Sequence, residues 1–108
     1  MDEQVKRILA ELRQELERLY GDRLRHLILF GSQARGDAEP GWDSDIDVLV
    51  VLRGPVVSGE EIERSSRIVA DLSLRHDMAV SRIFMDEDRF RYRSGPLLRN
   101  VRRDGIPV

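Results

Sequence analysis

The stretch "LILFGSQARGDAEPGWDSDIDVLVVL", residues 27–52, decides the fold. Two apolar runs of the kind that form buried strands flank a connection rich in glycine and small polar residues. The second run begins with two carboxylates, Asp45 and Asp47, separated by one residue. Side chains two positions apart in a strand point to the same face, about 7 Å apart. We therefore expect both carboxylates on one face, where the strand leaves the connection.

This pair of carboxylates predicts a metal site. Two carboxylates held together repel each other unless a cation lies between them or one is protonated. Oxygen ligands suit a hard cation, and Mg²⁺ typically takes one or two carboxylates together with substrate phosphates. A third acid would complete a two-metal site, and Asp77, which we expect to open a third strand, is the candidate. The alternative is that Asp45 and Asp47 are strand-edge or capping residues and that Asp77 is an ordinary turn residue.

The step from Gly31 to Ser32 closes the first apolar run. Glycine permits a tight turn and lets a ligand approach the backbone. We expect Ser32 to cap one helical turn over residues 32–35 and to offer its hydroxyl and N–H groups to an anion. Arg35 either clamps a phosphate oxygen or is only solvated or paired with an acid. Opposite the acidic pair, this turn suits a nucleoside triphosphate bound together with Mg²⁺.

The order of predicted elements is helix, strand, loop, strand, helix, strand, helix. Apolar residues at helical spacing predict the first helix over residues 2–20. The strand over residues 45–52 is apolar at both alternations apart from its aspartates, so we expect it to be covered on both faces. The fold class is therefore α/β (α+β), a small mixed β-sheet with helices packed on it.

The second half of the chain supplies the remaining elements. Ser58, followed three residues later by Glu61, is a capping-box pattern and predicts a helix start. We expect its inner face to consist of Ile62, Ser66, Val69, Leu72 and Ser73. The alternating run "DMAVSRIF" predicts the third strand, and "MDEDRFRYRSG" a polar connection with at most one helical turn. "PLLRNVRRDG" predicts a last helix, and "IPV" a short edge strand.

Composition limits the classes of function. The chain has 108 residues, which we read as one domain over residues 1–108. The absence of cysteine excludes disulfides and thiolate metal sites, and no apolar run is long enough for a membrane helix. The first 20 residues do not resemble a targeting peptide, so we expect a cytoplasmic location. A net charge of −2 makes direct nucleic-acid binding unexpected.

The C-terminal third has a character of its own. Of the 18 basic residues, 17 are arginines, and those between Arg82 and Arg103 outnumber the acids there. This makes the segment mildly basic and a candidate docking face. Phe84, Phe90 and Tyr92 are expected to form the base of the core or a patch for a partner.

The segment "GSQARGDAEPGWDSDID" resembles the signature of the DNA polymerase beta-type nucleotidyltransferase superfamily. The short chain, the "GSxARG" form and the closing "PLLRNVRRDGIPV" resemble the minimal nucleotidyltransferase (MNT) proteins, antitoxins of HEPN/MNT pairs. The resemblance implies the nucleotidyltransferase fold, with Gly31 and Ser32 holding the nucleotide phosphates. It implies that Asp45 and Asp47 are Mg²⁺ ligands. It makes Asp77 the third carboxylate, which helps to deprotonate the acceptor.

The activity implied is transfer of a nucleoside monophosphate, AMP from ATP, to a hydroxyl of a partner HEPN toxin, with two Mg²⁺ ions as cofactors. Two alternatives stay open. One is a non-catalytic antitoxin that neutralises the toxin by complex formation. The other is a small-molecule nucleotidyltransferase similar to the aminoglycoside-modifying enzymes. The sequence does not decide between a homo-oligomer and a hetero-oligomer.

Overall fold

The computed structural model describes residues 1–36 and 46–108. Its helices and strands follow the predicted order, with a helix where the polar connection was expected. No helix in the described part of the chain is both long and apolar enough to span a membrane. The elements are α1 (Glu3–Tyr20), η1 (Gly21–Arg23), β1 (Leu24–Phe30), α2 (Ser32–Arg35), β2 (Ile46–Leu52), α3 (Ser58–His76), β3 (Val80–Asp86), α4 (Glu87–Tyr92), α5 (Pro96–Asp104) and β4 (Ile106–Pro107).

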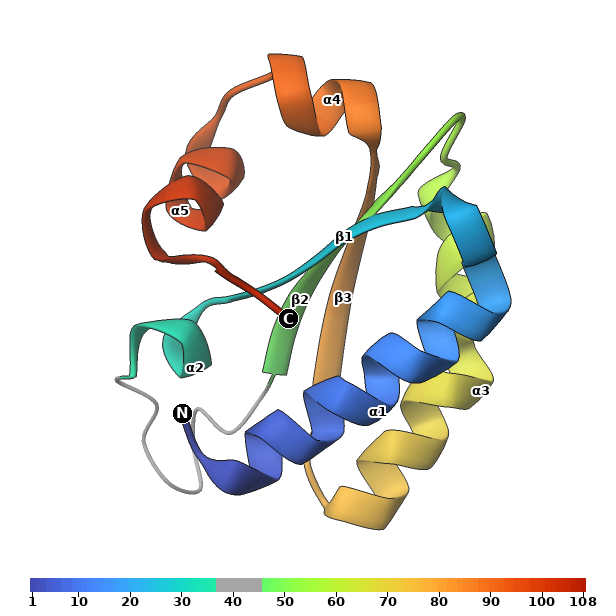
Figure 1. Cartoon of the computed structure of the whole chain (residues 1–108), viewed down its shortest axis with the longest axis vertical. Helices are drawn as coiled ribbons and strands as arrows, with labels where there is room; N and C mark the ends of the chain where they lie inside the picture. The colour runs from blue at the N-terminus through green and yellow to red at the C-terminus, as the bar shows by residue number, and fades with distance from the viewer. Residues whose placement is uncertain (37–45) are drawn as a thin grey trace.

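The four strands form one mixed sheet in the order β3-β2-β1-β4 (Figure 1). β2 is antiparallel to β1 and parallel to β3, and the predicted edge strand β4 is antiparallel to β1. Phe30 at the end of β1 pairs with Asp47, and Ile46 at the start of β2 pairs with Val80. The end of β1 and the beginnings of β2 and β3 therefore meet at one end of the sheet, which we call the site end. The predicted fold class is confirmed.

Helices cover both faces of the sheet, and β2 contributes residues to the hydrophobic cluster on each face. Its residues Ile46, Val48, Val50 and Leu52 belong to the larger hydrophobic cluster, with α1 and α3. Leu49 and Val51 belong to the smaller cluster, with Leu98 and Val101 of α5. This alternation follows from the two-residue period of a strand. The prediction that β2 is buried on both faces is confirmed.

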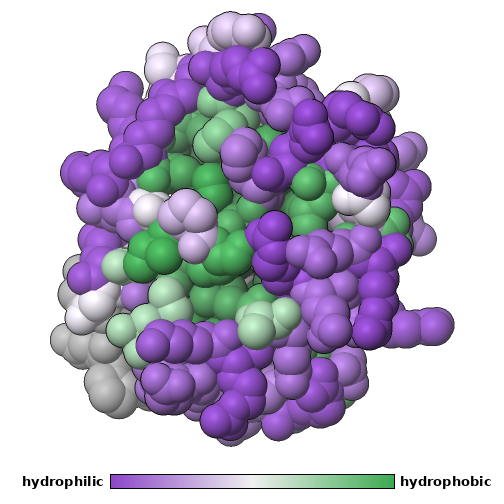
Figure 2. Space-filling view, in the orientation of Figure 1, coloured by the Kyte–Doolittle hydropathy of each residue, from purple (hydrophilic) through white to green (hydrophobic). Residues whose placement is uncertain are grey.

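The face seen in Figure 1 is apolar in the middle. In the same orientation, Figure 2 shows hydrophobic residues gathered there and hydrophilic residues around them. α1 and the last residues of the chain line a hollow of about 360 Å³, with Leu9, Ala10 and Ile106 in its wall. The short strand β4 thus closes the sheet beside α1.

Two predicted helix caps are wrong. The N-cap of α2 is Gly31, and Ser32 is its first helical residue. The N-cap of α3 is Val57, with no capping hydrogen bond from a side chain, so the Ser58 capping box does not form. The carboxylate of Glu61 instead accepts hydrogen bonds from other side chains. The Ser58–Glu61 pattern of a capping box is present, but the Glu61 side chain is buried against other side chains and does not reach back to the helix start.

The inner face of α3 also differs from the prediction in its first half. Val69 and Leu72 are buried as expected, but Glu61 and Ser65 are buried in place of Ile62 and Ser66. Tyr20 Oη donates to Glu61 Oε1 at 2.9 Å, and Arg64 Nη1 donates to the same oxygen at 2.7 Å. From β3, the Nε of Arg82 donates to Ser65 Oγ at 2.8 Å. Both buried polar side chains therefore have hydrogen-bond partners, which offset the cost of removing them from water.

Candidate functional site

Gly31 and Asp47 lie against each other at the site end of the sheet. Gly31 follows the last residue of β1 and has φ 77°, a backbone conformation that favours glycine. A Cβ atom placed on Gly31 would lie 2.5 Å from Asp47 Oδ2 and 3.3 Å from Asp47 Cγ. Any side chain at position 31 would therefore displace the carboxylate. The bare backbone at this turn is what allows the Asp47 carboxylate to lie there.

The turn after Gly31 is short and tight. The backbone N–H groups of Ala34 and Arg35 both donate to the Gly31 carbonyl at 3.1 Å, and Gly36 donates to the Ser32 carbonyl at 2.9 Å. Gly36 then ends α2 in the left-handed conformation. Ser32 is half-buried and Arg35 is exposed. The structure thus places the predicted phosphate-binding residues in one helical turn, directly beside the strand end that carries Asp47.

The face of the sheet that carries Asp47 becomes more open toward the site end. Asp47 has the same strand parity as Leu49 and Val51, so its side chain lies on the α5 face. Along the neighbouring β3, the same face is buried at Met85, 37% exposed at Ile83 and exposed at Ser81. A ligand can therefore approach Asp47 from this side. Ser81 is the register partner of Asp47, and sequence reasoning missed it because the parallel register cannot be read from the chain.

Asp77 lies one turn before the strand that it was predicted to open. β3 begins at Val80, and Asp77 is the C-cap of α3 with φ 50° and ψ 47°. Its side chain is exposed, and its backbone N–H donates to the Ser73 carbonyl. The N–H of Ile46 donates to the carbonyl of Ala79 at 2.9 Å, so this turn adjoins the start of β2. The third strand is confirmed, but it begins three residues later than predicted; Asp77 does not open it and lies at the site end all the same.

The structure places only part of the predicted metal site. Asp45 lies outside the described residues, so Asp47 and Asp77 are the predicted acids that can be located. Within residues 1–36 and 46–108, no group of three His, Cys, Asp or Glu side chains could hold a metal ion. The chemistry of the donor nevertheless fits Mg²⁺, because Asp47 presents a carboxylate in a cradle that a Cβ at position 31 would fill. Further ligands would have to come from outside these residues or from a substrate.

Comparisons with known proteins show which family the chain matches. The family model described as "Nucleotidyltransferase domain" matches residues 9–100. A protein of Methanocaldococcus jannaschii, provisionally named protein adenylyltransferase MJ0141, is 33% identical over 76 residues. That match covers 70% of this chain and 74% of the relative.

Solved structures of toxin–antitoxin systems have a similar fold. One is a toxin–antitoxin with AMP-PNP, with a TM-score of 0.60 and 24% identity over 89% of this chain and 68% of that chain. Another is the complex of a tri-AMPylated Shewanella oneidensis HEPN toxin with an MNT antitoxin, with a TM-score of 0.50 and 19% identity. It covers 93% of this chain and 70% of that one. At these identities the likeness is one of fold.

Proposed function

The chain belongs to the nucleotidyltransferase domain family, and we propose that it transfers AMP from ATP to a hydroxyl group of a partner protein. The observation that carries the proposal is the contact between Gly31 and Asp47. It joins a turn suited to phosphates and a carboxylate suited to a cation, inside the region that the family model matches. The relative provisionally named a protein adenylyltransferase supports an adenine nucleotide as the donor and a protein as the acceptor.

Phosphate binding falls to the turn after β1. The absence of a side chain at Gly31 lets a phosphate approach the backbone, and Ser32 adds a hydroxyl from the first helical position. Arg35, exposed at the end of the same turn, would reach a phosphate oxygen through its guanidinium. Together these groups would orient the triphosphate with its α-phosphorus toward Asp47.

Asp45, Asp47 and Asp77 are proposed as the acids of the site. Asp45 and Asp47 would hold Mg²⁺, in one or two ions, with Asp77 as the third carboxylate. When bound, Mg²⁺ would neutralise charge on the phosphate oxygens. The acceptor oxygen attacks the α-phosphorus while the bond from that phosphorus to the pyrophosphate oxygen breaks. The acceptor proton passes to a carboxylate, for which Asp77 is proposed, and pyrophosphate leaves. Most of the rate enhancement would come from positioning and from charge stabilisation.

The proposed acceptor is a HEPN toxin, so that the chain acts as the antitoxin of the pair. The solved toxin–antitoxin structures with a similar fold support this choice of partner. We propose further that residues 1–108 act as one minimal nucleotidyltransferase domain, in the cytoplasm, within a complex with the toxin. No membrane and no direct contact with nucleic acid are needed for this reaction.

The test is to incubate the protein with ATP, Mg²⁺ and a HEPN protein from the same organism, and to measure added AMP by mass spectrometry. We expect the wild-type protein to add AMP to the HEPN protein. The Asp47→Asn variant should transfer AMP at least about 100-fold more slowly, because removing one charge-stabilising group typically lowers the rate by that much. Arg18→Gln, an exposed substitution on α1, is the control and should retain activity.

Two other outcomes would replace the proposal. If the acceptor stays unmodified by wild type but binds tightly, and binding survives Asp45→Ala/Asp47→Ala, the chain is a binding antitoxin. If AMP appears on an aminoglycoside without any HEPN protein present, the chain is a small-molecule nucleotidyltransferase.

A further inference from the structure

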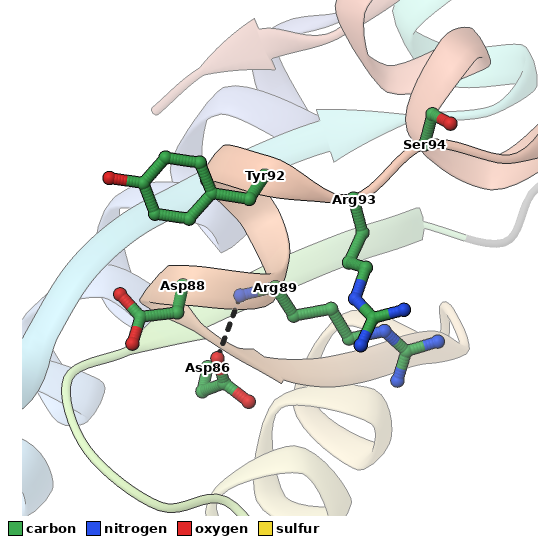
Figure 3. A pocket seen from close by; sticks show the side chains of 6 residues that line it. All are labelled: Asp86, Asp88, Arg89, Tyr92, Arg93 and Ser94. Carbon is green, nitrogen blue, oxygen red and sulfur yellow. Dashed lines mark hydrogen bonds between the residues drawn. The ribbon is translucent and has the colours of Figure 1, made fainter.

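A polar hollow lies at the end of the sheet opposite the site end. It has a volume of about 630 Å³ and is lined by Asp86, Asp88, Arg89, Tyr92, Arg93 and Ser94 (Figure 3). Asp86 is the last residue of β3, a seven-residue strand that begins at the site end, and the other lining residues follow it in the chain. At about 3.3 Å per residue, the hollow lies roughly 20 Å from Asp47. It is therefore separate from the proposed nucleotide site.

Two arginines dominate one side of this hollow. Both line the same hollow, and in Figure 3 their side chains reach toward the same side of it, Arg93 from above and Arg89 from the helix. Among the described residues, neither guanidinium has a hydrogen bond or an ion pair. By contrast, Arg91 on the same helix pairs with Glu87 at 3.6 Å. Two positive charges that line one hollow repel each other, so an anion bound there would remove an unfavourable interaction.

The backbone that carries the two arginines is held in place. Asp86 Oδ1 accepts a hydrogen bond from the Arg89 backbone N–H at 2.8 Å and so caps the start of α4. From α5, Arg102 Nη2 donates to the carbonyls of Phe90 at 2.8 Å and of Arg93 at 3.0 Å. The cap and the Arg102 contacts fix both ends of α4 before any ligand arrives. A prearranged surface loses less conformational entropy on binding.

The charges of the hollow indicate the kind of ligand. Asp88 lies on the side away from the two guanidinium groups (Figure 3). With Asp86, it balances the two arginines, so a nucleic-acid backbone would meet repulsion as well as attraction. A guanidinium matches a carboxylate through two parallel hydrogen bonds. Tyr92, whose surface is 74% exposed, adds the kind of aromatic residue that is enriched with arginine at binding hot spots.

We propose that Arg89 and Arg93 form a docking point for acidic side chains of the protein acceptor. This inference rests on the proposed function, because it places the acceptor on the same face of the sheet as Asp47. Figure 1 shows α5 between α4 and α2, and its Leu98 and Val101 pack with Met85 of β3 on that face. An acceptor anchored at the arginines would lie along it, with its reacting hydroxyl free to reach the site end. The docking point also accounts for the basic character of the C-terminal third.

The first experiment tests the site without the acceptor. Arginine Nε–Hε signals of the full chain are followed by NMR during titration with a hexaglutamate peptide, a hexaglutamine peptide, a 12-nucleotide RNA and inorganic phosphate. We expect saturable shifts of Arg89 and Arg93 with hexaglutamate and none with hexaglutamine. Stronger binding of RNA or of phosphate at these arginines would overturn the choice of ligand. The absence of any shift with hexaglutamate would overturn the docking point.

The second experiment measures affinity for the HEPN protein in the Asp47→Asn background, where transfer is blocked. Arg89→Gln/Arg93→Gln is compared with Arg7→Gln/Arg67→Gln, which removes the same charge from exposed positions on α1 and α3. We expect the first pair to weaken binding about 10-fold or more, as for hot-spot arginines, and the control pair to leave it unchanged. Equal affinities would overturn the docking point.

The two proposals fail in different ways. If binding depends on Arg89 and Arg93 but the wild-type protein transfers no AMP, the docking point stands and the proposed activity fails. If AMP is transferred and the arginine variants bind and react like wild type, the activity stands and the docking point fails.

Discussion

The two faces of the sheet differ in how much they contribute to stability and in how easily a ligand can reach them. The face under α1 and α3 carries the larger cluster, to which the described part of the chain contributes 16 buried residues, six of them from α1 and two from β1. The face under α5 carries a cluster of six buried residues and becomes exposed toward Asp47. Burial of apolar surface is the main favourable term in folding, so the first face supplies most of the stability. The thinner cover on the second face leaves the strand ends reachable by ligands.

Truncating one leucine on each face gives the largest expected effect. Leu12 is 1% exposed in the larger cluster and Leu98 is 4% exposed in the smaller one. We expect Leu12→Ala to lower the free energy of unfolding by about 4 kcal/mol and Leu98→Ala by about 2 kcal/mol, because the thinner layer can relax into the cavity. Chemical denaturation measures both. Equal losses would show that the two faces contribute alike.

The Gly31 turn gives a smaller effect on stability and a larger one on activity. Gly31→Ala should destabilise the fold by about 1–2 kcal/mol through its positive φ. It should also abolish most AMP transfer, because the new Cβ displaces the Asp47 carboxylate. Gly36→Ala is a matched control, since Gly36 has φ 80° but no described atom within 4 Å of its Cβ position. If both variants keep full activity, the contact with Asp47 does not matter for function.

The buried polar group of the larger face gives an effect on stability of similar size to that of Gly31→Ala, and we expect no loss of activity with it. Tyr20→Phe removes a hydrogen bond to Glu61 and should cost about 1–2 kcal/mol at neutral pH. Burial, and then the Glu61 carboxylate, raise the pKa of Tyr20 above its ordinary value. A phenol with a raised folded-state pKa contributes stability below its unfolded pKa of about 10, and this contribution is lost as the pH rises further.

Denaturation at neutral and alkaline pH measures that difference. Wild type should lose stability above about pH 10 more steeply than Tyr20→Phe, so the gap between them narrows. Tyr92→Phe, on the exposed side chain, is the control and should follow wild type. A gap that stays constant with pH would contradict the role of Tyr20.

Much of the fold could be predicted from the pattern of apolar residues. The runs at residues 24–30 and 46–52 are short, apolar and bounded by turn residues, and both form strands. The apolar residues of α1 recur at every third or fourth position, which indicates a helix equally directly. In the structure Asp2 caps this helix by accepting a hydrogen bond from the Gln4 N–H at 2.6 Å. These signals are local, so they survive in the folded chain.

The errors concern features that depend on distant partners. Glu61 is buried because Tyr20 and Arg64 satisfy its carboxylate, whereas hydropathy alone puts Ile62 inside. For the site, the proximity of Gly31 to Asp47 follows from the antiparallel pairing of two neighbouring strands, which the sequence could indicate. The position of Asp77 depends on the residue at which α3 ends, and the sequence could not indicate that residue.

The left-handed backbone of Asp77 affects how mutants of this residue should be interpreted. Asp77 is the one non-glycine residue with positive φ in residues 1–36 and 46–108. Alanine is poorly tolerated there, so a weak Asp77→Ala variant would combine the loss of a charge with a strained helix end. Asparagine accepts the same backbone, so Asp77→Asn changes the charge alone, and Asp77→Gly removes the side chain without strain. The backbone at this position thus decides which substitutions report on chemistry.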